Sequence, residues 1–237
     1  MRLYLFELGR VRTGEPILGY LVQTGEKRNV LIDTGYKPGT FGEDDMDKTA
    51  FLQALPDQLV THHLMKLGLS PEDIDYVVVT HLDPDHGGFT GSFPRAELVI
   101  QRRHLDLARS TDAPRFRLTR PAWGAPGLRY KELDGDAEIL PGIQLIETSG
   151  HVTGHQSVLL RLPRTGVVLL PIDAVAREHL SVPPEERVAG PFDENEAELR
   201  QSTRKLIDLV AREHAFVIFA HDAEQWQTLR HSPDYYD

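Results

Sequence analysis

The chain has 237 residues, of which 40% are hydrophobic and 26% charged, and its formal net charge is −10. This length suits one large domain, and we expect residues 1–237 to form a single domain. The negative charge argues against a nucleic-acid partner, because proteins that bind polyanions concentrate Lys and Arg on one face. Since the chain has no cysteine, nitrogen and oxygen atoms must hold any metal ion.

Apolar runs in this sequence are short. The N-terminal stretch MRLYLFELGR is interrupted by Glu7, and no later run approaches the length of a membrane span. We therefore expect a cytoplasmic protein, a monomer or homodimer, with no membrane contact.

Nine short runs rich in β-branched residues predict strands. In chain order they are LYLFEL near residue 3, GYLVQT near 19, NVLIDTG near 29, YVVVTH near 76, AELVIQ near 96, IQLIETSGH near 143, SVLLRL near 157, GVVLLPIDA near 166 and FVIFAH near 216.

Helical periodicity predicts helices over residues 51–67, 104–110 and 194–213. The last has one apolar face formed by Leu199, Leu206, Leu209 and Val210. Asp193, with Glu196 three positions later, is the predicted N-cap of this helix. Strands also follow one another directly, so the pattern indicates a mixed α and β fold with a mixed sheet or two sheets. Two irregular stretches, residues 36–47 and 111–127, are predicted to be substrate-facing loops.

Potential metal ligands follow four separate strands. VVVT runs into His81, LIETSG into His151, VVLLPI into Asp173 and FVIFA into His221. Loops that leave strand ends can converge on one site, which scattered surface histidines would not do. A surface or capping position is expected for the remaining histidines His62, His63, His104, His179, His214 and His231.

The first of these strand ends is the densest, because THLDPDHGG adds Asp83, Asp85 and His86 directly after His81. Residues 81 and 83 can point the same way from extended backbone, and the two glycines permit a tight turn. One loop can therefore serve two neighbouring ions. Together with the later strand ends it provides seven nitrogen and oxygen ligands, a set that suits two ions bridged by an aspartate.

These motifs resemble those of the metallo-β-lactamase superfamily. THLDPDHGG resembles its H-x-H-x-D-H motif, and LIDTG, TSGHVTGHQS, PIDA and FAHDAEQ occur along the chain in the order of its remaining landmarks. The segments GHVTGHQS and FAHDAEQWQTLRHSPDYY resemble the N-acyl-homoserine lactonase branch. The resemblance implies an α+β fold, a four-layer αββα sandwich with the metal ions at one edge between two sheets.

The resemblance also implies roles for single residues. His81, Asp83 and His151 would hold one ion. Asp85, His86 and His221 would hold the other, and Asp173 would bridge the two. His155 would orient the loop that carries His151, and Asp33 is either a turn residue or an orienting residue outside the ligand set.

Two positions depart from the pattern of the family. Asp83 stands where the family usually has its second histidine, and the added charge should shift this site from zinc toward iron, manganese or cobalt, or lower its zinc affinity. Ala176 stands where lactonases of the family commonly have a tyrosine that contacts the substrate carbonyl. We expect either that Tyr36 or His179 replaces that donor or that the substrate differs.

The leading hypothesis is a hydrolase that opens a lactone ring, most simply that of an N-acyl-homoserine lactone, by a hydroxide shared between two divalent ions, zinc first. Asp85 is the candidate proton shuttle. Phe41, Phe116 and Trp123 are either apolar walls around an acyl chain or simple anchors of their loops. The alternatives are another hydrolase on this fold, namely a thioesterase, β-lactamase or phosphodiesterase, a di-iron redox protein, or a catalytically silent ligand-binding protein.

Overall fold

The computed structural model describes residues 1–36 and 52–237, and its strands form two sheets. The first sheet has the strand order β4 (Leu52–Gln53), β1 (Arg2–Val11), β2 (Pro16–Gln23), β3 (Asn29–Ile32), β5 (Tyr76–Val78), β6 (Glu97–Gln101) and β7 (Arg129–Leu133). Strands β3, β5, β6 and β7 pair in parallel, whereas β1 pairs antiparallel with β2 and β4, and β2 with β3. The carboxyl ends of the parallel strands therefore open onto one edge.

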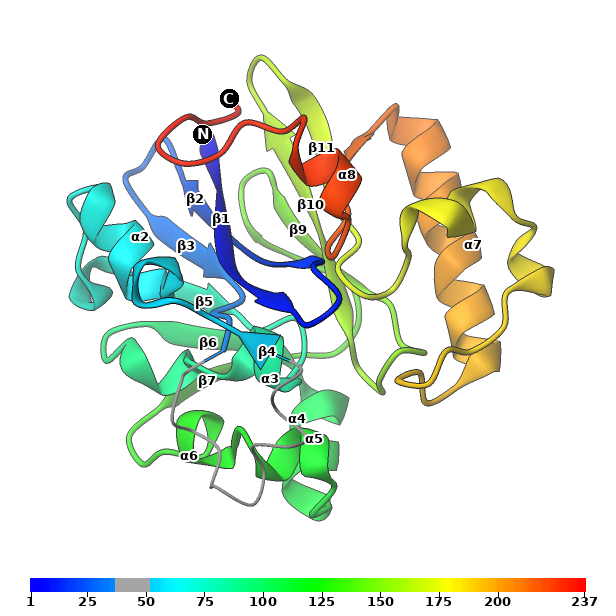
Figure 1. Cartoon of the computed structure of the whole chain (residues 1–237), viewed down its shortest axis with the longest axis horizontal. Coiled ribbons are helices and arrows are strands. Elements are labelled where there is room, and N and C mark those ends of the chain that lie inside the picture. The colour runs from blue at the N-terminus through cyan, green and yellow to red at the C-terminus, as the bar shows by residue number, and fades with distance from the viewer. Residues whose placement is uncertain (37–51) are drawn as a thin grey trace.

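The second sheet has the order β12 (Phe216–Val217), β11 (Gly166–Leu170), β10 (Gln156–Leu162), β9 (Ile143–Glu147) and β8 (Ala137–Leu140). Its pairs are antiparallel except for β11 with β12. In Figure 1, β9 to β11 lie beside β1 and β2, and both chain ends lie at the same side of the molecule. The C-terminal tail is joined to β1 through the pairing of Leu3 with Tyr236.

Helices cover the outer face of each sheet (Figure 1). Those on the side of the first sheet are α2 (Val60–Lys66), α4 (Arg102–Ser110), α5 (Pro114–Arg117) and α6 (Arg120–Trp123), and α7 (Glu196–Glu213) covers the second sheet. The short helices α3 (Pro84–Gly87) and α8 (Ala223–Trp226) follow strand ends. Single 3₁₀ turns occupy Pro56–Gln58, Pro71–Asp73, Thr90–Ser92, Arg177–Ser181 and Pro184–Glu186.

Three apolar clusters fill the spaces between these layers. Along β1, Tyr4 and Phe6 pack toward the helices, whereas Leu3 and Leu5 face the second sheet. This alternation follows from the two-residue period of a strand. A third cluster joins the second sheet to α7 through residues that include Leu206. The layers run helix, sheet, sheet, helix, so the expected four-layer αββα arrangement is confirmed.

All nine predicted strands are present, but β4, β7 and β8 were not predicted. Strands β7 and β8 are edge strands with half-buried, partly charged sequences, RYKEL and AEIL, so they lack the apolar run of a central strand. The prediction of a helix over residues 51–67 was wrong at its start. Residues 52 and 53 pair with β1, and α2 begins only at Val60, after Pro56 has started a 3₁₀ turn.

The predicted N-cap of α7 was also wrong. Asn195, not Asp193, caps this helix, because its Oδ1 accepts hydrogen bonds from the backbone nitrogens of Ala197 at 3.1 Å and Glu198 at 3.2 Å. The Asp193 side chain instead contacts His151, 42 positions away in the sequence.

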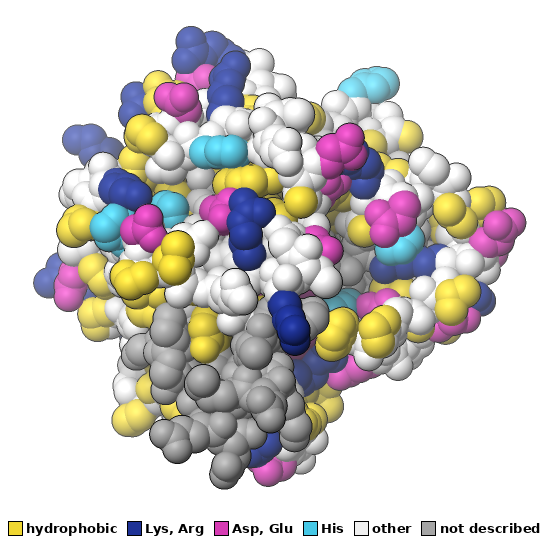
Figure 2. Space-filling view, in the orientation of Figure 1, with side chains coloured by type: hydrophobic (Ala, Val, Ile, Leu, Met, Phe, Trp, Pro, Cys, Tyr) yellow, Lys and Arg dark blue, Asp and Glu magenta, His cyan; other side chains and the backbone are white. Residues whose placement is uncertain are grey.

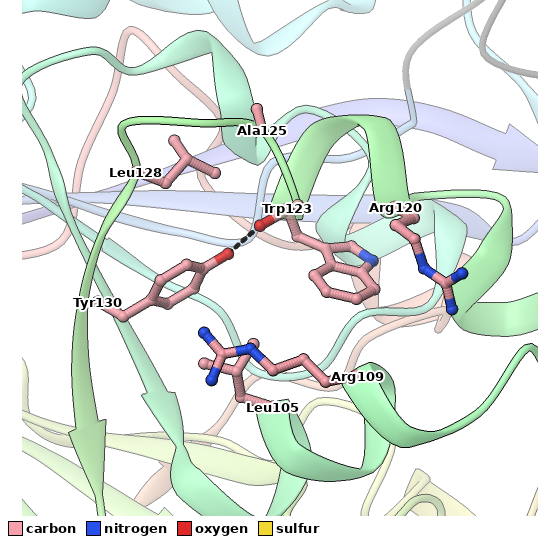
Figure 3. A pocket seen from close by; sticks show the side chains of 8 residues that line it. Leu105, Arg109, Arg120, Trp123, Ala125, Leu128 and Tyr130 are labelled. Carbon is pink, nitrogen blue, oxygen red and sulfur yellow. Dashed lines mark hydrogen bonds between the residues drawn. The ribbon is translucent and has the colours of Figure 1, made fainter.

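Residues 111–127, which were predicted to be an irregular, substrate-facing loop, contain the short helices α5 and α6. Phe116 is 1% exposed and Trp123 is 5% exposed, and both belong to the core beneath the helices. Trp123 also lines a surface pocket with Tyr130 and Leu128, and Figure 3 shows its backbone oxygen bonded to the Tyr130 hydroxyl. Their apolar surface is thus used in packing, as expected of loop anchors, and their place as walls for an acyl chain stays a prediction. Phe41 and the predicted loop beyond Tyr36 lie outside the described residues.

Two surface properties bear on partners. Within the described parts of the chain, none of the helices is long and apolar enough to span a membrane. On the face drawn in Figure 2, acidic and basic side chains are interspersed rather than separated into single-sign patches.

Candidate metal centre

Four histidine side chains from three loops turn their Nε2 atoms toward one carboxylate, Asp173. Its Oδ2 lies 3.4 Å from His81 Nε2, 3.3 Å from His86 Nε2 and 3.5 Å from His151 Nε2, and its Oδ1 lies 3.4 Å from His221 Nε2. These residues follow β5, β9, β11 and β12, so the two sheets both contribute to the cluster. The convergence expected from the strand ends is present.

Two further carboxylates lie on opposite sides of Asp173. Asp83 Oδ2 lies 3.7 Å from His81 Nε2 and 3.3 Å from His151 Nε2. Asp85 Oδ2 lies 3.6 Å from both His86 Nε2 and His221 Nε2. The seven side chains therefore form two three-residue groups with a shared carboxylate between them.

The cluster fits two divalent ions. Four of its buried polar atoms have no hydrogen-bond partner among the described residues: His81 Nε2, Asp83 Oδ1, His86 Nε2 and Asp173 Oδ1. Buried polar atoms are normally satisfied, so orphaned atoms that face each other indicate a missing ligand. Neighbouring donors around a tetrahedral ion at about 2.1 Å lie roughly 3.4 Å apart, and the spacings here are of that size.

The outer nitrogen of each histidine is held by a separate acceptor. Nδ1 of His81 lies 3.1 Å from Thr80 Oγ1, Nδ1 of His86 lies 2.8 Å from Asp33 Oδ2, Nδ1 of His151 lies 2.9 Å from Asp193 Oδ1, and Nδ1 of His221 lies 2.9 Å from the Pro16 carbonyl. A histidine whose Nδ1 donates in this way presents the lone pair of Nε2 to the centre.

Asp33 connects the end of β3 to the loop that follows β5. Its Oδ1 accepts from the Thr80 backbone nitrogen at 2.9 Å, and its Oδ2 accepts from Thr80 Oγ1 at 2.7 Å and from His86. Asp33 is buried and has a φ of 55°, and His221 has a φ of 58°. Left-handed backbone at residues other than glycine is costly and persists where the surroundings enforce it. The contacts of Asp33 are therefore those of an orienting residue.

His155 closes the loop that carries His151. Its backbone oxygen accepts from Thr148 N at 2.8 Å, and its Nδ1 lies 2.9 Å from Thr148 Oγ1. Its ring centroid lies 5.1 Å from that of His81 and 6.1 Å from that of His151, and its Nε2 has no hydrogen-bond partner among the described residues. Burial lowers the pKa of His155 well below its usual value, which favours the neutral imidazole.

Close glycine contacts bring the loops together. A Cβ on Gly88 would meet the backbone oxygens of Pro84 at 2.5 Å and Gly35 at 2.8 Å. A Cβ on Gly150, whose φ is 134°, would meet the Leu199 backbone at 2.4 Å. These residues flank the two loops that carry most of the histidines, so their backbones can approach only in the absence of a side chain.

Nearby carboxylates favour the protonated forms of His86 and His151, whereas burial lowers the pKa of His81. Burial opposes charge on His86, but Asp173 and Asp85 outweigh it and raise the pKa of His86 well above its usual value. Burial likewise opposes charge on His151, yet its hydrogen bonds to Asp193 and Asp83 raise the pKa to about 10. Protons and metal ions therefore compete for the same nitrogens.

Three residues at the cluster had no predicted site role. Arg115 Nη2 lies 2.8 Å from Asp83 Oδ2. Asp193 fixes His151, although its position suggested a helix cap. His104 is fully buried, contrary to the surface or capping position expected for it. Its Nε2 accepts from Leu82 N at 3.0 Å, and its Nδ1 donates to the Thr153 oxygen at 2.7 Å. Sequence spacing gives no signal for these contacts, because each joins segments far apart in the chain.

The two candidates for the missing tyrosine lie outside the ligand groups. Tyr36 is half-buried, and burial raises its pKa. His179 lies in the 3₁₀ turn after Ala176, and its Nδ1 accepts from the Ala176 backbone nitrogen at 3.1 Å. This bond leaves the proton of a neutral His179 on Nε2.

Comparison with known proteins decides the family. The sequence profile of the metallo-beta-lactamase superfamily matches residues 12–221. The chain belongs to the metallo-β-lactamase superfamily. This agrees with the order of its motifs and with the αββα layers described above.

Relatives within the superfamily are named lactonases. An N-acyl homoserine lactonase of Bacillus cereus is 34% identical over 229 residues, covering 93% of this chain and 86% of that protein. A crystal structure of B. thuringiensis AiiA with N-decanoyl-L-homoserine bound at its active site superposes with a TM-score of 0.85 and 27% identity, covering 99% of this chain and 98% of that one. An N-acyl homoserine lactone hydrolase with the product N-hexanoyl-L-homoserine at its catalytic metal centre gives the same values.

Proposed function

We propose that this superfamily member is a metal-dependent hydrolase that opens the lactone ring of N-acyl homoserine lactones. The observation that carries the proposal is the Asp173 carboxylate, which faces all four histidines and lies between two complete ligand groups. The lactonases that match over most of the chain support the choice of substrate class.

The proposed ligand sets are those expected from the sequence. His81, Asp83 and His151 would hold one divalent ion, Asp85, His86 and His221 would hold the other, and the Asp173 carboxylate would be shared by the two groups, with zinc as the first choice of metal. When bound, two such ions supply Lewis acidity toward an ester carbonyl and a hydroxide nucleophile at neutral pH.

Asp85 is the residue proposed to move the proton. Ring opening adds water across the ester bond, so the attacking water loses a proton and the ring oxygen gains one when the carbon–oxygen bond breaks. Asp85 is only partly buried, and its Oδ2 faces the Nε2 atoms of His86 and His221. A carboxylate at this place can accept the first proton and deliver the second.

His179 is proposed to replace the tyrosine absent at Ala176. Because its Nδ1 is bonded to the backbone of that residue, its Nε2–H remains as a donor for a substrate carbonyl. Burial lowers the pKa of His179, which keeps it neutral at pH 7. We expect His179→Phe to raise KM or lower kcat/KM by about tenfold, the worth of one hydrogen bond. Tyr36→Phe is the matched test of the other candidate, and unchanged kinetics in His179→Phe would eliminate His179.

The decisive experiment is a ring-opening assay. Protein reconstituted separately with Zn, Fe, Mn and Co would be given homoserine lactones of short and long acyl chains, and acid release would be followed with a pH indicator. Thioester, β-lactam and phosphodiester substrates would be run in parallel. Turnover of a phosphodiester or thioester without lactone turnover would reject the proposal, as would oxygen-dependent turnover of the iron form without hydrolysis.

The domain organisation, location, oligomeric state and partners of the protein are also proposals. We propose that residues 1–237 act as a single domain in the cytoplasm, as a monomer or homodimer with a small-molecule ester or lactone as its only partner. The apolar cluster shared by both sheets supports one domain. Size-exclusion chromatography with light scattering and cell fractionation test the oligomeric state and location.

A further inference from the structure

The carboxylate at the unusual ligand position is paired with a buried cation. Arg115 Nη2 lies 2.8 Å from Asp83 Oδ2, and the two side chains are only 16% and 12% exposed. Arg115 lies on the short helix α5, 32 positions after Asp83 in the chain. Because both groups are largely withdrawn from water, their charges act on each other and on the cluster with little screening.

Arg115 is held firmly in this position. Its Nη1 donates to Glu194 Oε1 at 2.7 Å and to the His151 oxygen at 3.4 Å, and its Nη2 donates to the Phe192 oxygen at 3.0 Å. The guanidinium therefore joins three segments around the ligand group of His81, Asp83 and His151, the first metal site. Glu194 is 37% exposed, so water screens its charge more than that of Asp83.

The pair changes the charge count of the first site. A histidine at position 83 would contribute a neutral donor, whereas a lone aspartate would add one negative charge. Asp83 with Arg115 adds an oxygen donor but no net charge. A lone carboxylate at position 83 would shift the site toward harder ions, and the Arg115 guanidinium balances the charge part of that shift.

We propose that Arg115 is a positioning residue that sets the charge of the first metal site, so that the Asp83–Arg115 pair acts toward the ion as a neutral imidazole would. The inference rests on the proposed metal-dependent function for the presence of an ion at that site. Arg115 acts through Asp83, whose Oδ2 it holds beside His81 and His151.

A double-mutant cycle tests the charge count. The four proteins are the wild type, Arg115→Met, Asp83→His, and the double variant Asp83→His with Arg115→Met. Methionine keeps an apolar stem without the charge. The affinity of each metal-free protein for Zn²⁺ and for Co²⁺ would be measured by competition with a chelator, and bound metal would be counted by elemental analysis.

The expected order follows from the local charge. Arg115→Met should bind the first ion about tenfold or more tightly than wild type, and Asp83→His about tenfold or more weakly, because a unit charge acts on a divalent ion over a few ångströms in a partly buried medium. The double variant restores neutrality and should return to within a few-fold of the wild type. Its Co²⁺ absorption should indicate an additional nitrogen ligand.

Two further variants separate charge from structure. Arg115→Lys restores the cation without the forked contacts and should return the affinity toward wild type. Arg120→Met, on the neighbouring helix α6, removes an arginine that pairs with Asp112 at 3.0 Å instead of a ligand, and should leave both affinities unchanged.

The proposal is overturned if Arg115→Met weakens metal binding in both backgrounds, which would make Arg115 a purely structural residue. It is also overturned if none of the variants alters the affinity. Because the readout is metal binding, a protein that shows the predicted cycle but no lactone turnover would reject the proposed function and leave this inference standing.

Discussion

The four histidines of the cluster differ in what holds their outer nitrogens: a hydroxyl for His81, a carboxylate for His86 and His151, and a carbonyl for His221. A carboxylate partner makes an imidazole more basic and fixes its ring more firmly than a carbonyl does. Asp33 is the most connected of these partners, since it also accepts two hydrogen bonds from Thr80. At the scale of single residues, substitution of Asp33 should lower metal affinity more than substitution of any other residue outside the proposed ligands.

Replacing Asp33 with asparagine should lower the metal affinity of the site formed by Asp85, His86 and His221. Asparagine tolerates the left-handed backbone at this position but accepts fewer hydrogen bonds, so His86 loses its charged partner. Loss of such a partner typically lowers metal affinity by about 10- to 100-fold. Titration of metal-free protein with Zn²⁺ would measure this. Asp75→Asn is the matched control. Asp75 precedes β5 and accepts hydrogen bonds from Arg28 and from the Asn29 backbone nitrogen, not from a histidine of the cluster. Two ions bound with wild-type affinity in Asp33→Asn would contradict the orienting role.

At the scale of elements, α4 connects the two loops that carry most of the ligands. His104, near its start, joins the backbone of Leu82 in one loop to that of Thr153 in the other. Burial lowers the pKa of His104 to about 4, so the side chain is neutral in the folded protein near neutral pH. The bond from Leu82 requires this neutral form, since a protonated Nε2 cannot accept.

The buried histidine should make stability depend on pH. Between pH 6.5 and about 4 the unfolded chain binds a proton at His104 that the folded chain does not, so the free energy of unfolding falls as the pH decreases. The contribution is roughly 3 kcal/mol over the whole interval. His104→Gln should be less stable than wild type at pH 7.5, and most of the difference should vanish by pH 4.5.

Urea denaturation of metal-free protein at the two pH values measures this effect. His62→Gln serves as control, because His62 on α2 is half-buried and lies outside the ligand loops. It should retain the pH dependence of the wild type. An equal loss of stability in His104→Gln at both pH values would show that protonation of His104 contributes nothing.

At the scale of the whole molecule, the cluster joins the two sheets. The loop after β5 in the first sheet carries four of the proposed ligands, and the loops after β9, β11 and β12 in the second sheet carry the other three. His221 is additionally bonded to Pro16 at the start of β2. Bound ions would therefore stabilise the packing of the sheets as well as act in chemistry.

Metal removal should lower the thermal stability of the entire domain. A ligand that binds only the folded state stabilises it by about 2.7 kcal/mol at 100 times its dissociation constant. We expect the melting temperature of chelator-treated protein to rise by several degrees as Zn²⁺ is added, in a concentration-dependent manner. The rise should be much smaller in Asp173→Asn, which loses the shared charge. A melting temperature independent of Zn²⁺ would contradict a metal site between the sheets.

Local patterns in the sequence were enough to predict the nine apolar strands and the histidines and aspartates that follow them, whereas the αββα layers were implied by the family resemblance. The central strands are recognisable because their apolar runs are buried on both faces, and the ligand positions because they follow those runs directly. The edge strands β7 and β8 were missed for the converse reason, since half-buried strands lack such runs. The short helices that carry Phe116 and Trp123 were not predicted, because helices of a single turn leave no periodic signal.

Only the tertiary structure decided the partners that surround the ligands. Arg115 meets Asp83 across 32 positions, Asp193 meets His151 across 42, and Asp33 meets His86 across 53. The sequence determines by itself which residues follow each strand, because backbone period and burial act over a few neighbouring residues. It does not reveal which charges meet, because that depends on how separate loops pack at the shared edge of two sheets.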